Sequence, residues 1–333
     1  MSTAQNIAIY VNNFGQQNPT SQQLAELQGY ASALNTSGFT TGILWALHVD
    51  ASGDFIYNDG PPMIVGGQLQ SGLSDLPGLL STVKQSGGTV NKLLFSIGGW
   101  TCESDFVNIG NLITQYGIGS QNPLYANFQA LQSALYIDGI DLDLEANSSP
   151  PPYGHSYSYY TDTVVQLTQM LNSIGMETTY CPYMDEDFWL NCMAEVYSQN
   201  NNQQIVSWWN LQCYAGGSSN DPSSWVQQMK DYSSPTGVSD PAAFIVPGYW
   251  CANPGTSCQP ETYQGVMCPS GIEDTFSNLM TTDAGINGGF IWNYGDLISC
   301  ENSGQCSGDP MTVNAYAQAI INGLSTTKTL KAP

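Results

Sequence analysis

The sequence predicts a single α/β domain, a (β/α)8 TIM barrel that spans residues 1–333. The first observation is that eight apolar segments, rich in β-branched and aromatic residues, recur along the chain and are typical of buried strands. The second is that helix-like segments alternate with them, as in parallel βα units. The third is that no change in composition, repeat or linker indicates a second domain.

The eight predicted strands are short and occur at moderate spacing, at 6–11, 42–49, 92–97, 137–145, 177–183, 205–214, 243–249 and 288–293. The eight predicted helices are 20–34, 71–85, 122–135, 156–173, 187–199, 221–232, 261–280 and 311–324. The alternative fold is an open doubly wound sheet, which usually has a glycine-rich phosphate loop after its first strand. Residues 12–15 read Asn-Asn-Phe-Gly and do not form such a loop, so the barrel is favoured.

The charge of the chain limits its partners. Its 333 residues have a formal net charge of −22, and the only basic residues besides two histidines are five lysines. Nucleic acids and anionic membranes are bound through clustered Lys and Arg, so we expect neither as a partner. No apolar run is long enough to predict a transmembrane helix. We expect a monomer with a solvated acidic surface and a neutral or cationic partner.

The nine cysteines indicate a secreted protein. Five of them lie in late segments rich in Pro, Gly, Ser and Asn: Cys251, Cys258, Cys268, Cys300 and Cys306. The spacing contains no Cys-x-x-Cys pair, so we expect loop disulfides, with Cys300–Cys306 as the easiest closure, and no metal or cofactor. The odd total leaves one free thiol, for which Cys213 is the candidate. The first residues do not resemble a signal peptide, so the chain is either cytosolic from the start or, as we expect, a mature form.

One acidic segment, 138–145, is the strongest functional signal. Asp141, Asp143 and Glu145 alternate there with aliphatic residues, so on a strand they share one face, about 6–7 Å apart along it. Carboxylates this close repel one another, and at least one should hold its proton above its usual pKa. A catalyst that needs a protonated acid at neutral pH uses such an arrangement. A calcium loop would instead have Gly and Asn between its ligands.

Other polar and aromatic residues lie at the predicted strand ends, where barrel enzymes build their active sites. The third strand ends in Ser96-Ile-Gly-Gly-Trp100, and its glycines would allow backbone to approach the barrel axis. Asp138 differs in parity from Asp141, so we expect it to point away from the site. His48 and His155 have no partner at a spacing that indicates catalysis. Further candidates at strand ends are Tyr10, Gln212, Tyr214, Trp250 and Trp292.

With these residues the sequence resembles glycoside hydrolase family 18, the chitinases and endo-β-N-acetylglucosaminidases. The resemblance rests on two motifs, Ser96-x-Gly98-Gly99 and Asp138-Gly-x-Asp141-x-Asp143-x-Glu145, with support from Tyr214 and Trp292. The strand pattern behind it spans nearly the whole chain. The resemblance implies substrate-assisted catalysis with retention, an exception to the scheme of two enzyme carboxylates.

The resemblance also implies a role for each residue. Glu145 would protonate the glycosidic oxygen and then activate water, while the 2-acetamido oxygen of the substrate acts as the nucleophile. Asp143 would hold the acetamido N–H and stabilise the oxazolinium, and Asp141 would share a proton with Asp143. Tyr214 would bind the acetamido group, and Trp292 would form the floor beneath the sugar. Weaker candidates for substrate contact are Tyr10, Ser96, Gly98, Trp100, Gln212 and Trp250.

Departures from the common family pattern leave the substrate open. Many members have an aromatic residue where this chain has Ala146, and Met-x-Tyr-Asp where it has Gln212-Cys-Tyr-Ala215. Residues 250–287 leave no room for the small α+β domain of larger members, which implies a shallow groove and endo-type cutting. The leading hypothesis is a chitinase that cleaves β-1,4-linked N-acetylglucosamine. The alternatives are an endo-β-N-acetylglucosaminidase acting on the N-glycan chitobiose core, a non-catalytic chitin-binding lectin, and a metal enzyme that uses the carboxylates.

Overall fold

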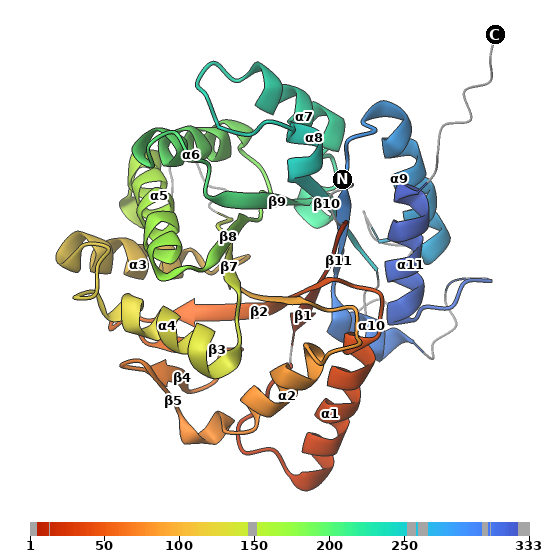
Figure 1. Ribbon diagram of the computed structural model, residues 1–333, viewed down its shortest axis with the longest axis horizontal. Helices are drawn as coiled ribbons and strands as arrows, with labels where there is room; N and C mark the ends of the chain where they lie inside the picture. Colours follow the sequence, from red (N-terminus) through yellow and green to blue (C-terminus); the bar gives the residue numbers. More distant parts are fainter. Residues whose placement is uncertain are drawn as a thin grey trace.

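The computed structural model describes residues 5–12, 14–145, 152–251, 258, 266–301, 306 and 308–325. Eight parallel strands form a closed ring in which β1 pairs with both β2 and β11 (Figure 1). The predicted (β/α)8 barrel is therefore confirmed. In chain order the ring strands are β1 (Asn6–Asn12), β2 (Thr41–Val49), β6 (Lys92–Gly98), β7 (Gly139–Asp143), β8 (Glu177–Tyr180), β9 (Val206–Gln212), β10 (Ile245–Trp250) and β11 (Gly288–Trp292).

Helices cover the outside of the ring (Figure 1). Local sequence sets several of their ends: Thr20 and Gln23 form a capping box at the start of α1, and Gly175 ends α5 in a left-handed conformation. The helices are α1 (Ser21–Asn35), α2 (Leu76–Val83), α3 (Glu103–Tyr116), α4 (Pro123–Leu135), α5 (Tyr157–Ile174), α6 (Glu186–Gln199), α7 (Pro222–Asp231), α8 (Pro241–Phe244), α9 (Pro269–Thr282), α10 (Tyr294–Cys300) and α11 (Val313–Leu324). Short 3-10 turns occupy Ser71–Leu73, Pro152–Gly154 and Ala215–Gly217.

Two apolar cores stabilise the barrel, because its strands are buried on both faces. Along β1, Ala8 and Tyr10 belong to the smaller core, whereas Ile7, Ile9 and Val11 belong to the larger one. The larger core also contains the buried faces of the surrounding helices, so it fills the space between ring and helices. The smaller core is inside the ring and also contains Ile43, Leu94, Cys181, Trp208, Tyr214, Val246 and Phe290.

Three short strands and one long helix were not among the predicted elements. The strands β3 (Phe55–Tyr57), β4 (Pro62–Val65) and β5 (Gln68–Leu69) extend β2 as an antiparallel sheet outside the ring. They are shorter than the runs that reveal a strand in sequence. The missed helix, α3, has apolar residues at helical spacing, but Gly110 and several β-branched residues weaken its helix propensity.

Several predicted elements have different limits in the structure, among them the acidic strand and the helix 261–280. β7 ends at Asp143, so Glu145 follows the strand by two residues instead of ending it. The predicted helix 261–280 begins at Pro269, and its first five residues lie outside the described residues. Within the described part of 250–287, the additional β-structure is one bridge between Trp250 and Val266, which agrees with the predicted lack of an α+β insertion.

The late cysteines form two disulfides, Cys258–Cys300 and Cys268–Cys306. The predicted Cys300–Cys306 closure is therefore wrong. Cys300 is the last residue of α10, a helix that the sequence did not predict, and Cys306 pairs with the residue that precedes α9. Cys251 is in neither disulfide, and Cys213 has a free thiol, as predicted.

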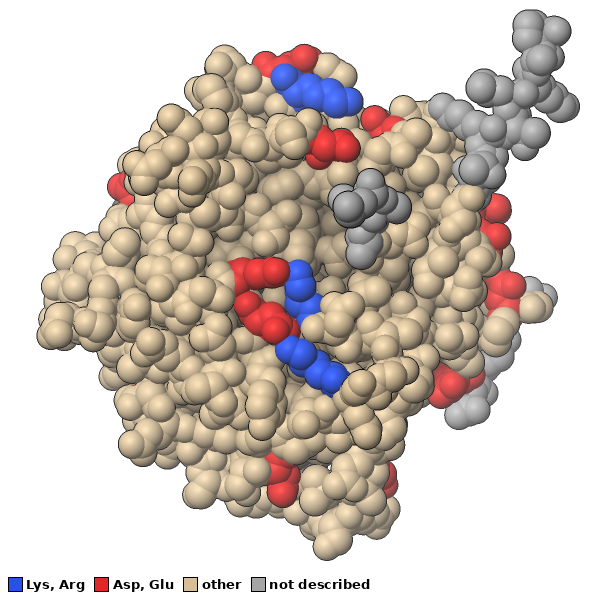
Figure 2. Space-filling model, in the orientation of Figure 1, with Lys and Arg blue, Asp and Glu red and all other residues tan. Residues whose placement is uncertain are grey.

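The lysines at the strand starts are paired with acids. Lys84 lies 2.7 Å from Asp138 and Lys92 lies 2.6 Å from Glu177. Asp138 precedes β7 and so points away from Glu145, as predicted. On the face drawn in Figure 2, the basic side chains lie beside acidic ones and form no continuous basic patch. Among the described residues, no helix is long and apolar enough to cross a membrane.

Candidate active site

The register of the sheet assembles a polar layer inside the ring. Ser96 on β6, Asp141 on β7 and Thr179 on β8 are direct Cα partners across neighbouring strands. Ser96 Oγ donates to Asp141 Oδ2 at 3.1 Å, and Thr179 Oγ1 donates to Oδ1 at 2.6 Å. The Tyr10 hydroxyl and the Asn210 amide add hydrogen bonds of 2.7 and 2.9 Å. Asp141 is therefore a fully buried carboxyl group with four donors around it.

The four donors counteract the cost of burying Asp141. Burial raises the pKa of Asp141, and the hydrogen bonds from Thr179, Tyr10, Asn210 and Ser96 lower it. These bonds also fix the orientation of the carboxyl group. In this conformation the donors satisfy both oxygens of Asp141, and the proton shared with Asp143 stays a prediction.

A second polar layer lies two residues further along the strands, closer to their carboxyl ends. The Gln212 amide nitrogen Nε2 donates to Asp143 Oδ1 at 2.9 Å and to Glu145 Oε1 at 3.2 Å, so one amide bridges the two carboxyl groups. Asp143 is 3% exposed and Glu145 is 9% exposed. Ionisation of both Asp143 and Glu145 is disfavoured, because the two acids lie close together where little water reaches them.

The pKa values in this layer are shifted toward the protonated forms. Burial, then the charges of Glu145 and Asp141, raises the pKa of Asp143 well above its usual value. Burial also raises the pKa of Glu145, while the hydrogen bond from Gln212 acts in the opposite direction. The pair therefore retains a proton at a pH where isolated carboxyl groups are ionised.

The glycine pair of β6 lies against the backbone of β7. A Cβ atom on Gly98 would be 2.2 Å from the Asp143 carbonyl oxygen, and φ of Gly98 is +101°. The N–H group of Gly99 donates to the same carbonyl at 2.7 Å. Gly98 thus allows close approach to β7, and the Gly99 N–H fixes the backbone that bears Asp143. A Cβ atom on Gly99 would be 2.9 Å from Nε1 of Trp45, so this glycine makes room for the Trp45 ring.

A pocket of about 430 Å³ opens over the second layer. Asp143 and Glu145 lie in it together with Gln212 and Tyr214. Tyr214 stacks on Trp292 with ring centroids 6.0 Å apart and an interplanar angle of 21°. Burial raises the pKa of Tyr214 well above 10, so its hydroxyl stays protonated and can donate. The remaining lining side chains are mostly aromatic: Trp45, Trp100, Tyr183, Trp250 and Trp292.

The structure separates the predicted site residues into two groups. The pocket contains Asp143, Glu145, Gln212, Tyr214, Trp100, Trp250 and Trp292. Tyr10, Ser96 and Gly98 are buried and lie outside this lining, so substrate contact by these three stays a prediction. Tyr10 and Ser96 hold Asp141 beneath the pocket.

Sequence reasoning missed several residues of the site. Thr179 and Asn210 hold Asp141, and Asn210 was detectable because it precedes Gln212 by two positions on β9 and so shares its face. Cys181 lies 3.1 Å from the Tyr10 hydroxyl. Trp45 and Tyr183 line the pocket, and the buried Nε1 of Trp45 has no hydrogen-bond partner among the described residues. Tyr183 was detectable as the last residue of the predicted strand 177–183, whereas Trp45 lies in the middle of β2, where no strand end marks it.

Known structures share this architecture. A group IV chitinase from Ostrinia furnacalis, solved with allosamidin, is similar with a TM-score of 0.59 and 11% identity, covering 96% of this chain and 99% of that one. A glycoside hydrolase family 18 chitinase from Cycas revoluta, also solved with allosamidin, has a TM-score of 0.58 and 13% identity over 94% and 98% of the two chains. A chitinase-like agglutinin from Robinia pseudoacacia has a TM-score of 0.56 and 13% identity over 94% and 99%.

The similarity to these structures identifies the fold class of this chain. This chain has the barrel of the family 18 chitinases and of chitinase-like proteins, which include an agglutinin. No protein-family model matches the chain, and no curated protein matches it. At 11–13% identity the similarity to these three structures is a similarity of fold, and activity must be argued from the pocket.

Proposed function

We propose that this chain is a glycoside hydrolase of the family 18 type, a retaining endo-chitinase that hydrolyses β-1,4-linked N-acetylglucosamine. The observation that carries the proposal is the pair of buried, proton-retaining carboxyl groups, Asp143 and Glu145, bridged by Gln212 at the base of an aromatic pocket. General-acid catalysis at neutral pH needs a carboxyl group whose pKa is raised in this way.

In the proposed reaction, Glu145 is the acid. It is the outermost of the three carboxyl groups and lines the pocket, so it can protonate the glycosidic oxygen of a bound chain. The acetamido oxygen of the substrate attacks C1 as the bond to the leaving sugar breaks, and an oxazolinium forms. Glu145 then takes a proton from the water that opens this ring, which returns the original anomeric configuration.

The neighbouring groups position the acetamido group. Asp143 accepts from the acetamido N–H, and its negative charge stabilises the positive oxazolinium. The protonated Tyr214 hydroxyl donates to the acetamido oxygen and holds it beneath C1. Gln212 keeps the two carboxyl groups in place, and Asp141 below them shares a proton with Asp143 and so sets the charge of Asp143.

The aromatic lining suits a neutral sugar polymer. Pyranose rings present C–H faces that pack on aromatic side chains, and Trp292, Trp250 and Trp45 line this pocket. Trp100 is 77% exposed at its edge, where an incoming chain would meet it. We propose that Trp292 forms the floor under the reacting sugar and that Trp100 and Trp250 contact neighbouring units.

A lectin is the second candidate, because a chitinase-like agglutinin shares the fold. The buried acid pair favours an enzyme, since a binding site gains nothing from two repelling carboxyl groups. An endo-β-N-acetylglucosaminidase would use the same groups on the chitobiose core of N-glycans. We also propose a secreted, monomeric protein with one domain over 1–333; the two disulfides support secretion.

The test compares Glu145→Gln with wild type and with Glu195→Gln, a matched change of a half-buried residue on α6 that does not line the pocket. We expect wild type and Glu195→Gln to cleave chitooligosaccharides and Glu145→Gln to lose about 10²–10⁴-fold in kcat while it still binds them. Binding without cleavage by wild type would identify a lectin. Cleavage of a high-mannose glycoprotein but not of chitooligosaccharides would identify the endoglycosidase, and equal activity of the Glu145 variant would refute the mechanism.

A further inference from the structure

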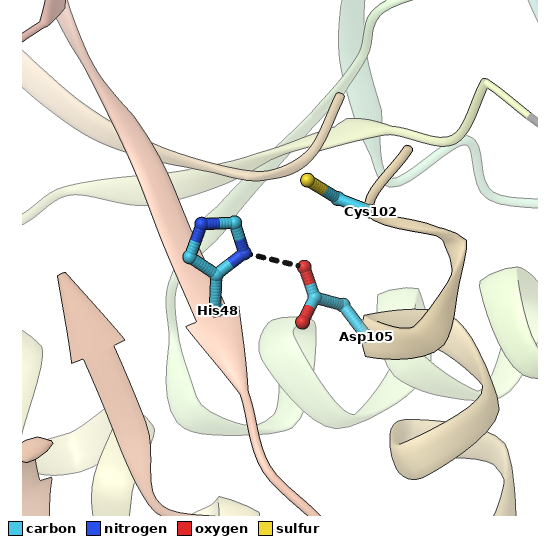
Figure 3. A group of neighbouring side chains, drawn as sticks. All are labelled: His48, Cys102 and Asp105. Carbon is cyan, nitrogen blue, oxygen red and sulfur yellow. Dashed lines mark hydrogen bonds and ion pairs between the residues drawn. The ribbon is translucent and has the colours of Figure 1, made fainter. Parts of the chain in front are cut away.

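Beside the acidic pocket, three side chains with metal-ligating atoms converge. His48 lies on β2, Cys102 immediately precedes α3, and Asp105 is in the first turn of α3 (Figure 3). One ligand atom from each of the three lies within 4.8 Å of the others. We call His48, Cys102 and Asp105 the His48 cluster.

The contacts of the cluster already orient two of its three ligands. His48 Nδ1 is 2.9 Å from Asp105 Oδ2, so this ring nitrogen faces the carboxylate. Asp105 Oδ1 accepts from the Val49 backbone N–H at 3.0 Å, which fixes the carboxylate from its other side. The second ring nitrogen, Nε2, is 3.6 Å from Asp59 Oδ1. A histidine with a carboxylate facing its outer nitrogen is the arrangement that supports metal-bound histidines in proteins.

The cluster borders open space. A cavity of about 530 Å³ is lined by all three side chains, and it shares Trp45 and Trp100 with the acidic pocket but contains none of Asp141, Asp143 and Glu145. Cys102 is also the only partly exposed residue among the described cysteines outside the disulfides; the other four are buried. An ion from solvent can therefore reach this thiol.

We propose that His48 Nδ1, Cys102 Sγ and Asp105 Oδ2 bind a divalent metal ion of the zinc class. Thiolate, imidazole and carboxylate are the ligands that zinc prefers, and three protein ligands leave the fourth tetrahedral position to a water molecule in the cavity. Ligand atoms bound to one zinc ion lie about 3.3 Å apart, so His48 and Asp105 would separate by about 0.4 Å on binding.

The bound ion would add a further link between two segments that already contact each other through Asp105. His48 is on a ring strand, whereas Cys102 and Asp105 belong to the start of α3. The loop between β6 and α3 carries Trp100, and Cys102 Sγ lies 3.5 Å from the Trp100 carbonyl oxygen. The ion would therefore hold this edge of the pocket, and its binding does not depend on the proposed hydrolysis.

The test is a titration of the full, chelator-treated chain with Zn²⁺ by calorimetry, and with Co²⁺, whose thiolate bond gives a charge-transfer absorption band. Wild type should bind one ion per chain and show the band. Cys102→Ser should lose the band and bind Zn²⁺ at least tenfold more weakly, and His48→Gln should weaken binding by a similar factor. Circular dichroism establishes that each variant is folded, and either variant alone suffices if the other does not fold.

Two controls separate this site from others in the chain. Cys192→Ser changes a buried free thiol on α6 and should bind as wild type does. Glu145→Gln should also bind as wild type, which excludes the catalytic carboxyl groups as ligands. The proposal is overturned if wild type binds no stoichiometric ion, if Cys102→Ser binds as wild type does, or if Glu145→Gln loses the ion.

Discussion

The acidic pocket over Asp143 and Glu145 and the cavity beside the His48 cluster share Trp45 and Trp100, but the chain builds the two sites in different ways. Asp141, Asp143 and Glu145 follow one another at every second position of one segment; strand geometry aligns the first two, and Glu145 follows two residues after the end of β7. The His48 cluster joins residues 57 positions apart, and the pairing of β2 with β6, which leads into α3, brings them together. A site of the first kind is visible in sequence, and a site of the second kind is not.

The two regions also differ in electrostatics. Burial raises the pKa values of both Asp143 and Glu145, and the charges of Glu145 and Asp141 raise that of Asp143 further. His48 and Asp105 form a complementary acid–base pair at 2.9 Å. The first arrangement stores a proton for chemistry, whereas the second is favourable in itself and available for exchange with a metal ion.

The largest expected effect on this comparison comes from Asp143→Asn. The variant keeps the size of the side chain but removes the charge that stabilises the oxazolinium. We expect kcat on chitooligosaccharides to fall by about 10²–10³-fold with a smaller change in KM, as for the removal of one transition-state contact. A change confined to KM would show that Asp143 only binds substrate.

Asn210→Ala tests whether the buried network matters to stability. It removes one of the four donors to Asp141, and a lost hydrogen bond to a buried carboxylate costs about 1–3 kcal/mol. Denaturant unfolding should therefore show a lower free energy of unfolding. The control is Asp59→Asn beside the His48 cluster, where the Asp59 side chain is 95% exposed, and it should leave the free energy of unfolding unchanged. If the two variants lower the free energy of unfolding equally, the two regions do not differ in their contribution to stability.

The pH dependence of hydrolysis sharpens the electrostatic contrast. Because burial raises the pKa of Glu145, the acid stays protonated further into the neutral range, and kcat/KM should fall as pH rises through this pKa. The charge of Glu103 on α3 also raises the pKa of Glu145, so Glu103→Gln should move this basic limb to lower pH. We expect less than about a tenfold change at a fixed pH on that limb. A shift to higher pH would contradict the assignment.

The smallest expected effect is on thermal unfolding of Glu145→Gln. A carboxyl group with a raised folded-state pKa stabilises the protein at low pH, and this stabilisation is lost as pH rises through that pKa. The non-titrating Gln avoids this loss, so the variant should unfold about 2 °C higher than wild type at neutral pH. The difference should vanish below about pH 4, where Glu is protonated in both states. If Glu145→Gln unfolds at a lower temperature than wild type at neutral pH, burial does not disfavour the ionised form of Glu145.

Much of the fold and the centre of the site follow from local sequence. The eight ring strands are buried on both faces and read as apolar runs, and Asp141, Asp143 and Glu145 read as one face of a strand. No local sequence pattern predicts the short strands β3–β5 or the pairing of Cys300 with Cys258, because both depend on contacts between distant segments. The positions of turns and of helix ends, such as the end of α10, determine which cysteines lie close enough to form a disulfide.

The supporting residues of the site show the same limit in more detail. The alternation of residues along the strand predicted the face on which Asp141 lies. It did not predict the register between strands, which makes Ser96 and Thr179 the neighbours of Asp141. Tyr10 and Ser96 were predicted to contact substrate because they lie on strands of the barrel. Their depth along the strand, which is set by the stagger of the ring, places them beneath the pocket.

The most direct test of the proposed chemistry asks whether the substrate supplies the nucleophile. Wild type is incubated with a chitooligosaccharide and with a glucose oligosaccharide of the same length and linkage, and the first products are followed by proton NMR. The account predicts cleavage of the N-acetylated chain alone, with the β-anomer formed first. Cleavage of the glucose chain at a comparable rate, or initial release of the α-anomer, would contradict it.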